Sequence, residues 1–364
     1  MNPTGGNKVF SALTALRMQE GGLIVVILVL GLLLTIFSGT VPRAEFRKTA
    51  NGEIERVMVE KNKFLNSQTL VQLAKDTSFI AIMAVGATFV IIAGGIDLSV
   101  GSIFALASVL GAMVFHQFGP EVAGEAAGWA HISLGILACL LTGTLCGLAN
   151  GGMIVALRVH PFIITLGTMA IYRGIAFVTT KGQSIGSFPA SFRELVRWET
   201  AGGLSLVPLI VMIGVAVAGG IYLSRLAAGR RVYAVGGNEL ASRYSGVRVA
   251  RVKLSVFIFS GLTAGIAALL SLGYYGAATS GDGQGYELNV IAAAVVGGAS
   301  LSGGRGSALG ALLGALLIQM ISTGIVILDI DQNYSQIIIG AVVVLAVVLD
   351  QVNNWLARRR LLKH

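Results

Sequence analysis

Long runs of apolar residues, separated by short polar segments, make up most of the chain. The hydrocarbon core of a bilayer is about 30 Å thick, so an α-helix needs about 20 mainly apolar residues to cross it. The pattern therefore predicts an all-α integral membrane protein, with about ten transmembrane helices in a single bundle. The expected spans, of which the eighth is short, are 21–38, 70–93, 98–116, 131–157, 161–180, 204–225, 254–274, 288–299, 306–327 and 336–356.

The first apolar run follows Lys8 and Arg17, as the core of a secretory signal peptide would. It is longer than such a core and no small-x-small cleavage site follows it, so we expect an uncleaved span. Outer-membrane β-barrels consist of alternating strands of about ten residues, a pattern that these uniform runs lack. The expected location is therefore the bacterial inner membrane.

Basic residues between the apolar runs indicate the orientation of the chain. With the N-terminus in the cytoplasm, ten spans place both termini there, and the cytoplasmic segments hold fifteen Lys and Arg against nine outside. Cytoplasmic loops are enriched in these residues, so the bias supports this orientation. The predicted layout is a cytoplasmic segment 1–20, a transmembrane domain 21–356 with an outer loop 39–67 and a cytoplasmic segment 226–253, and a basic cytoplasmic tail 357–364.

Composition supports a membrane protein: 55% of the 364 residues are hydrophobic, 12% are charged and the mean hydropathy is +0.81. A soluble domain carries about 25% charged residues to face water. A net charge of +9 would suggest a nucleic-acid partner for a soluble protein. Here the basic residues lie mostly at the ends of apolar runs, so we expect lipid and no nucleic acid around the chain. Cys139 and Cys146 lie within one run, away from any metal-ligand spacing, and we expect packing thiols.

Two of the expected spans carry glycines at every fourth position. Such a ladder leaves a groove along one helix face, where a neighbouring helix can pack at backbone contact. The two ladders are Gly143, Gly147 and Gly151, and Gly306, Gly310 and Gly314. Packing without any further role is the simpler interpretation of both.

The segment 94–102 interrupts an apolar stretch with two glycines and places Asp97 and Ser99 where the next helix starts. Asp97 is a good N-cap, because its carboxylate can accept the unpaired N–H groups of a first helical turn. A polar group at this position also suits the mouth of a path for a hydrophilic solute. The two interpretations are compatible.

A polar stripe runs along the expected helix 161–180. Arg173 lies well inside this span, where an ionised side chain is costly, so it should face the bundle interior or an aqueous cavity and find a partner. Thr165, Thr168 and Tyr172 recur beside it at three-to-four-residue spacing, and Asn150 is a similar candidate on the preceding span. The stripe suits either a path for hydroxylated solutes or hydrogen bonds between helices.

The cytoplasmic segment after the sixth span contains a predicted helix of about two turns, from a cap at Asn238 to a stop at Gly246. Leu240 and Tyr244 form a small apolar face on it, while Glu239 and Arg243 form an ion pair at i,i+4 spacing. A helix this short is not stable alone in water, so something must pack on its apolar face. A partner protein and the chain's own helix ends are the two candidates.

Enzyme signatures fail where they occur. Residues 182–186 match G-x-S-x-G, but no strand precedes them and no helix follows, so a nucleophile elbow is not supported. Gly298 and Gly303 have the spacing of a Walker A motif, but Gly304 stands where the lysine is required. We expect no catalytic site, no metal and no cofactor bound by this chain, and any energy for its work must come from elsewhere.

Four segments in order resemble a known family, the membrane permeases of bacterial ABC importers for ribose, xylose, arabinose, galactose and related solutes. The resemblance covers residues 66–349. The segments that carry it are 94–102, 161–174 (PFIITLGTMAIYRG), 234–262 and 286–314, which ends in GGASLSGGRGSALGALLG.

This resemblance implies a fold like that of type II ABC importers, and a homodimer or paired permeases around one pathway. It further implies two cytoplasmic ATPase subunits, which use ATP and Mg²⁺, and a periplasmic sugar-binding protein. It makes 237–246 the coupling helix that docks in the ATPase. The sequence departs from the family's Glu-Ala-Ala-x-x-x-Gly pattern there, since Leu240, Ala241 and Ser242 occupy the first three positions. The outer loop 39–67 is longer than the family leads us to expect, and is either an added contact for the binding protein or a tolerated insertion.

We therefore expect import of a monosaccharide or related polyol by alternating access, driven by ATP hydrolysis in a partner. The alternative is a secondary transporter driven by an ion gradient. That mechanism usually needs several buried carboxylates. Besides Asp97, the candidates Asp76, Asp329 and Asp350 all lie close to span ends.

Overall fold

The structure is a computed structural model that describes residues 5–48, 54–123, 128–200 and 203–361. Its elements are α1 (Gly5–Phe37), β1 (Thr40–Lys48), β2 (Ile54–Asn62), α2 (Ser67–Ile92), α3 (Val100–Gln117), α4 (Pro120–Ala123), α5 (Trp129–Leu157), α6 (Pro161–Thr180), α7 (Ala190–Val196), α8 (Leu206–Arg225), α9 (Ala227–Gly237), α10 (Glu239–Tyr244), α11 (Val249–Tyr275), α12 (Tyr286–Val296), α13 (Ala308–Ile327) and α14 (Tyr334–Leu361).

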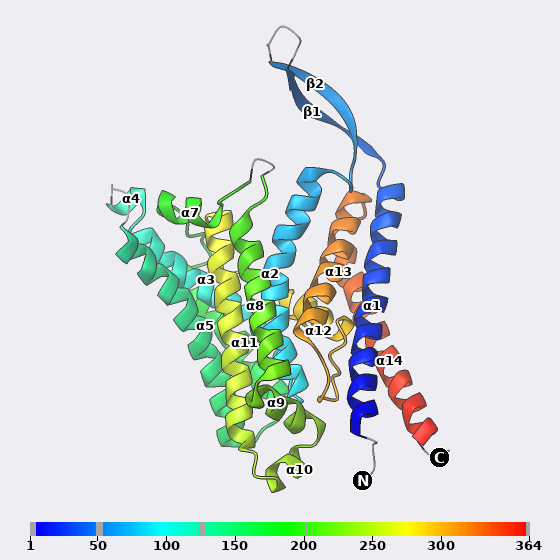
Figure 1. Ribbon diagram of the computed structural model, residues 1–364. Coiled ribbons are helices and arrows are strands. Elements are labelled where there is room, and N and C mark those ends of the chain that lie inside the picture. The colour runs from blue at the N-terminus through cyan, green and yellow to red at the C-terminus, as the bar shows by residue number, and fades with distance from the viewer. Residues whose placement is uncertain (1–4, 49–53, 124–127, 201–202, 362–364) are drawn as a thin grey trace.

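The long helices run side by side, with the β1–β2 hairpin projecting at one end and the short helix α10 at the other (Figure 1). We name these the hairpin end and the α10 end. Within the described residues, eight helices are long and apolar enough to cross a membrane, and two shorter apolar stretches, Tyr286–Val296 and Tyr334–Leu345, join them. Every expected span coincides with one of these helices, so the predicted helical membrane fold is confirmed. α1 begins and α14 ends at the α10 end (Figure 1).

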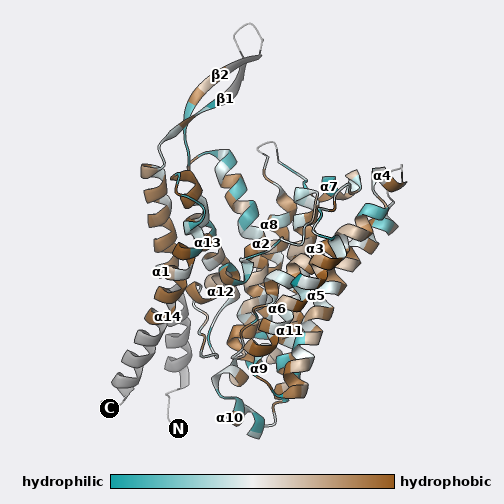
Figure 2. Ribbon diagram, turned by 180° about the vertical axis from the view of Figure 1, so that it is seen from behind, coloured by the Kyte–Doolittle hydropathy of each residue, from teal (hydrophilic) through white to brown (hydrophobic). Residues whose placement is uncertain are grey.

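Helix α2 forms the centre of the bundle, with every residue from Thr77 to Ile92 buried. It packs against α11, α13, α12 and α8, while α3 lies between α5, α11 and α6. The outer helices instead expose large apolar side chains, among them Leu28, Leu137, Ile163 and Ile213. In Figure 2 the ribbons of the long helices are coloured mostly hydrophobic, with hydrophilic residues gathered toward the two ends. An apolar surface of this extent requires lipid as its solvent.

One glycine ladder is confirmed and the other is partly wrong. A Cβ on Gly143 or Gly147 would lie 2.3 Å from a carbonyl oxygen of α11, so α5 and α11 meet at backbone contact. Gly310 and Gly314 pack as closely on the backbone of α12 and the glycine turn after it. Gly306, however, lies before the helix, because Ser307 is the N-cap of α13. Its φ of 148° is one that glycine adopts readily. It belongs to the turn.

The segment 39–67 contains strands that the sequence analysis did not predict. β1 and β2 pair antiparallel from Thr40 opposite Asn62 to Lys48 opposite Ile54. Asn62 fixes the base of the hairpin: its Oδ1 accepts from the Ser38 hydroxyl at 3.1 Å, and its Nδ2 donates to the carbonyl oxygen of Thr35 at 2.7 Å. The hairpin is thus tied to the last turn of α1.

The expected tail 357–364 lies mostly in the last turns of α14, which continues to Leu361, and residues 362–364 lie outside the described part of the chain.

Candidate functional site

A chain of buried polar side chains joins four parts of the bundle around Asp97. Asp97 lies in the turn between α2 and α3, where its Oδ1 accepts from the backbone N of Ser99 at 3.0 Å and from the Ser99 hydroxyl at 2.6 Å. Its Oδ2 accepts from the hydroxyl of Ser260 on α11 at 2.9 Å. Asn150 of α5 donates to the Ser99 oxygen at 2.7 Å and accepts from the hydroxyl of Tyr172 on α6 at 3.1 Å.

This network corrects the expected role of Asp97 at the helix start. The N-cap position of α3 is Ser99, and the helix begins at Val100. The turn before α3 directs the Asp97 carboxylate onto the N–H of Ser99 instead of the N–H groups of the first turn. Three donated hydrogen bonds compensate for burying a carboxyl group at 2% exposure in an apolar bundle.

The threonines of α6 also bond within the bundle. Thr165 donates to the carbonyl oxygen of Ile96 at 3.2 Å, next to Asp97, and Thr168 donates to the carbonyl oxygen of Thr165 at 3.3 Å. All six expected pathway residues other than Arg173 are buried in this conformation of a single chain. The structure thus brings five of them together through hydrogen bonds between elements, whereas Thr168 bonds within α6. A part in translocation stays a prediction for all six.

Arg173 faces away from this network and holds the segment 276–285. Its Nη1 donates to the carbonyl oxygens of Ser280, at 2.9 Å, and Asp282. The expectation that this half-buried cation finds a partner is confirmed, and the partners are backbone oxygens. The same segment touches the first turn of α3, since a Cβ on Gly101 would lie 2.5 Å from the Gly283 carbonyl oxygen. The chain therefore re-enters the bundle from the hairpin end before α12 begins.

This re-entry explains the short eighth span. Helix α12 has 11 residues, which is about half of what a crossing needs. The non-helical segment 276–285 and α12 together make the crossing. Non-helical backbone at membrane depth is found where protein or a water-filled cavity surrounds it, as in the broken helices of transporters.

Sequence reasoning missed two polar residues of the bundle. Ser260 is one of three serines in α11, with Ser255 and Ser271, and no sequence pattern distinguishes it from a packing serine. Lys75 is only 6% exposed, donates to the Tyr274 hydroxyl, and has its Nζ 4.4 Å from the centre of that ring. A lysine inside an expected span is a signal in itself, because such a cation needs a partner.

The segment 237–246 has the geometry that the sequence predicts. Asn238 caps α10, its Oδ1 accepting from the backbone N of Ala241 at 2.9 Å. Gly246, with a φ of 81°, follows the helix and allows the chain to turn into α11. Glu239 forms ion pairs with Arg243 at 3.7 Å and with Lys253 of α11 at 2.8 Å.

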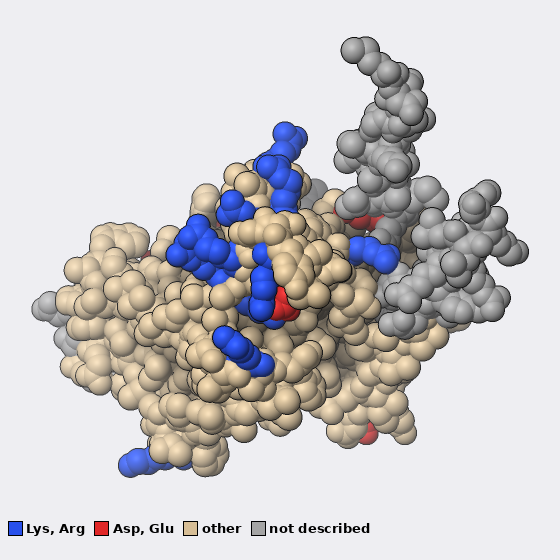
Figure 3. Space-filling model, turned by 90° about the horizontal axis from the view of Figure 1, so that it is seen from below, with Lys and Arg blue, Asp and Glu red and all other residues tan. Residues whose placement is uncertain are grey.

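The apolar face of α10 is uncovered. Leu240 is 61% exposed and Tyr244 is 83% exposed, so the helix does not bury this face against its own chain. Seen from the α10 end, Lys and Arg side chains gather on the same surface (Figure 3). The exposed arginines there include Arg225, Arg230, Arg231, Arg243, Arg248 and Arg251.

Comparison with known sequences assigns the chain to a protein family. A sequence model of the family described as "Branched-chain amino acid transport system / permease component" matches residues 69–347, from the start of α2 into α14. The chain belongs to this permease family. The hairpin lies outside the matched part.

Individual members of the permease family are similar over most of the chain. The ribose import permease of Escherichia coli K12 is 36% identical over 289 residues, which cover 79% of this chain and 87% of the relative. The D-allose transport system permease of the same strain is 35% identical over 79% of this chain and 85% of the relative. An autoinducer 2 import system permease of Yersinia enterocolitica is 33% identical over 85% of this chain and 93% of the relative. No solved structure matches.

Proposed function

We propose that this protein is the membrane-spanning permease subunit of an ABC importer and moves a monosaccharide or related polyol across the bacterial inner membrane. A partner subunit supplies the energy by hydrolysing ATP with Mg²⁺. Support for the solute class comes from relatives named for ribose and D-allose transport. The family description itself names branched-chain amino acids, so the solute needs a separate argument, given in the next subsection.

The uncovered helix α10 carries the proposal of an ATPase partner. Two exposed apolar side chains on a capped, ion-paired helix form a surface that a protein partner can bury. Such a short helix keeps its shape only through its caps and contacts. The matching cleft belongs to the ATPase in this proposal, and α10 is the coupling helix.

The contacts of α10 also suggest how its movement would reach the bundle. Lys253 ties α10 to the first turns of α11. Further along α11, Ser260 binds Asp97. A displacement of α10 would therefore pull on the turn between α2 and α3, beside Asn150 and Tyr172.

In the assembled importer, the α10 end faces the cytoplasm and the hairpin end faces the periplasm, where a sugar-binding protein docks. A second permease copy completes the pathway, most simply an identical one, because closed twofold assemblies are the commonest. The positive charge around α10 supports this orientation.

The deciding experiment removes the apolar face of α10. Leu240→Asp combined with Tyr244→Asp should release the ATPase from the purified complex and abolish ATP-dependent sugar uptake. Both side chains are exposed, so the helices should stay folded. Leu226→Asp is the matched control, an exposed leucine at the same end outside α10, and should retain the ATPase.

Two results would contradict the proposal. One is a double variant that still co-purifies with the ATPase. The other is uptake that persists in ATP-depleted cells and collapses with an uncoupler, which would identify an ion-gradient-driven secondary transporter.

A further inference from the structure

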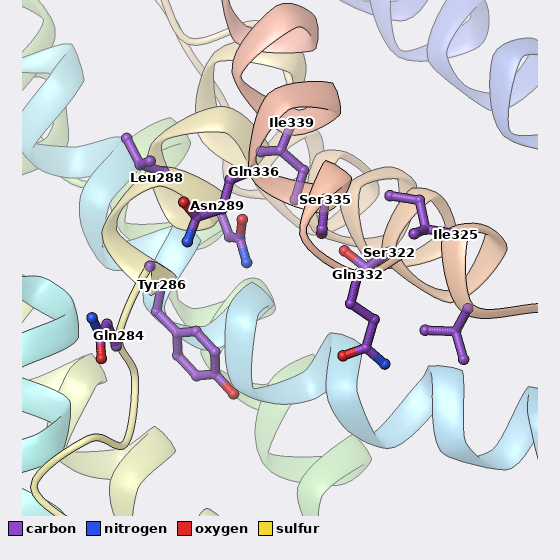
Figure 4. Close-up of a pocket in the computed structure, with 12 residues that line it drawn as sticks. Gln284, Tyr286, Leu288, Asn289, Ser322, Ile325, Gln332, Ser335, Gln336 and Ile339 are labelled. Carbon is purple, nitrogen blue, oxygen red and sulfur yellow. The ribbon is translucent and has the colours of Figure 1, made fainter. Parts of the chain in front are cut away.

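A pocket lined by both apolar and polar side chains opens between α12, α13 and α14, on the side of the bundle away from the Asp97 network. Its volume is about 350 Å³. Figure 4 shows side chains from all three helices around it. The polar ones that matter here are Tyr286, Asn289, Ser322, Gln332, Ser335 and Gln336.

The polar side chains of this pocket are all amides and hydroxyls, and none of the twelve lining residues is ionised. Each amide side chain offers both donors and acceptors, and each hydroxyl can do either. Among the described residues, the amide groups of Asn289, Gln332 and Gln336 make no hydrogen bond within the chain. Their hydrogen-bonding capacity is available to a ligand or to water.

The position of these amides argues against a surface that faces lipid. Ser322 lies five residues before the end of α13, about 8 Å into the bundle at 1.5 Å per residue. Asn289 lies in the first turn of α12, which begins inside the bundle. A carboxamide without a hydrogen-bond partner is costly in hydrocarbon, because it loses its hydration without compensation. These groups must therefore face water or a polar solute.

We propose that this pocket is a contact site for the transported solute in the hairpin half of the pathway, and that it recognises a small neutral polyol such as a monosaccharide. The inference rests on the proposed function and names the site for its solute. A volume of about 350 Å³ is at the lower end of the range for small-molecule sites, which suits one sugar ring. The hydroxyl groups of a sugar both donate and accept, as the lining amides do.

The absence of charge among the lining residues decides between solute classes. An amino acid carries an ammonium and a carboxylate group, and both would lose hydration here without a charged partner. A sugar loses only neutral hydrogen bonds, which the amides replace. The pocket therefore favours the sugar over the amino acid of the family description.

Arg173 acts on this pocket as a positioning residue. It holds the carbonyl oxygens of Ser280 and Asp282, just before Tyr286 and Asn289 on the pocket wall. The re-entrant segment that it fixes is what starts α12 inside the bundle and turns these side chains toward α14.

Thiol labelling tests whether the pocket is accessible to water. Asn289→Cys and Gln336→Cys should react with a membrane-impermeant thiosulfonate in intact cells, whereas Ile337→Cys, an exposed apolar neighbour outside the lining, should not. The native Cys139 and Cys146 are buried, so the unaltered chain gives a low background. Absence of labelling at both pocket positions would overturn the proposal.

Uptake measurements on pocket variants test whether the transported sugar contacts this pocket. In cells that carry the full importer, Asn289→Leu and Gln336→Leu should each lower the maximal uptake rate of radiolabelled ribose or D-allose about fivefold, as the loss of one hydrogen bond predicts. Asn333→Leu, an exposed amide outside the lining, is the matched control and should transport normally. Unchanged rates in both pocket variants would refute this site alone. No sugar uptake by the unaltered chain would refute the proposed function itself.

Discussion

At the scale of single residues, Asp97 links the turn between α2 and α3 to α11. Its two carboxylate oxygens accept three hydrogen bonds, and the chain of bonds continues to Asn150 and Tyr172. Removal of one member leaves the others buried without a partner, which costs more than the bond itself contributed.

We expect Asp97→Ala to abolish transport and to destabilise the bundle. The change leaves the Ser260 hydroxyl and the Ser99 N–H buried without an acceptor, at about 1–3 kcal/mol each. The measurements are the thermal midpoint of the detergent-purified protein and sugar uptake at matched membrane abundance. Asp97→Asn, which keeps one acceptor oxygen, should recover part of the midpoint. Uptake by Asp97→Ala at the rate of the unaltered chain would remove Asp97 from the functional residues.

Sequence patterns predicted the residue types of this network but not its connections. The polar stripe of Thr165, Thr168 and Tyr172 follows from helical spacing, and the structure confirms that these residues bond within the bundle. Ser260 could not be found, because it is 163 positions from Asp97 and only the fold brings them together. The pocket between α12 and α14 was missed for the same reason: Asn289 lies on α12, Gln332 and Gln336 lie just before and in the first turn of α14, and only the fold brings them together.

At the scale of elements, lengths of apolar runs predicted the helices well because the bilayer thickness fixes them. The failures occur where the backbone departs from a regular helix. The eighth crossing is half turns and other non-helical backbone, and Gly306 lies in a turn before α13. The strands of the hairpin are rich in charged residues, so the sequence analysis interpreted the segment as a polar loop.

The contact between α5 and α11 gives a prediction about an element pair. Gly147→Ala would place a Cβ 2.3 Å from the Phe257 carbonyl oxygen and force the two helices apart. We expect a loss of about 1–3 kcal/mol in stability, as for other overpacked cores, and a lower thermal midpoint. Gly152→Ala, in the same helix with open space around it, should leave the midpoint unchanged or raise it. Equal midpoints for both variants would show that the close approach is not needed.

At the scale of the whole molecule, the two ends differ in chemistry. The α10 end gathers arginines around an uncovered apolar helix, and the hairpin end carries a two-stranded sheet on a rigid base. A lone two-stranded hairpin is at best marginally stable in water, so its fixed base matters for its shape. This asymmetry fits a protein that meets different partners on the two sides of a membrane.

The last prediction concerns which end is outside. Met58, on the hairpin, is 58% exposed, and Tyr244, on α10, is 83% exposed. In spheroplasts, an impermeant thiol reagent should label Met58→Cys at once but Tyr244→Cys only after the membrane is opened. The reason is that arginines resist translocation, so the end that gathers them stays in the cytoplasm. The reverse labelling pattern would place α10 in the periplasm, where no ATP is available, and an ATPase could not drive transport through it.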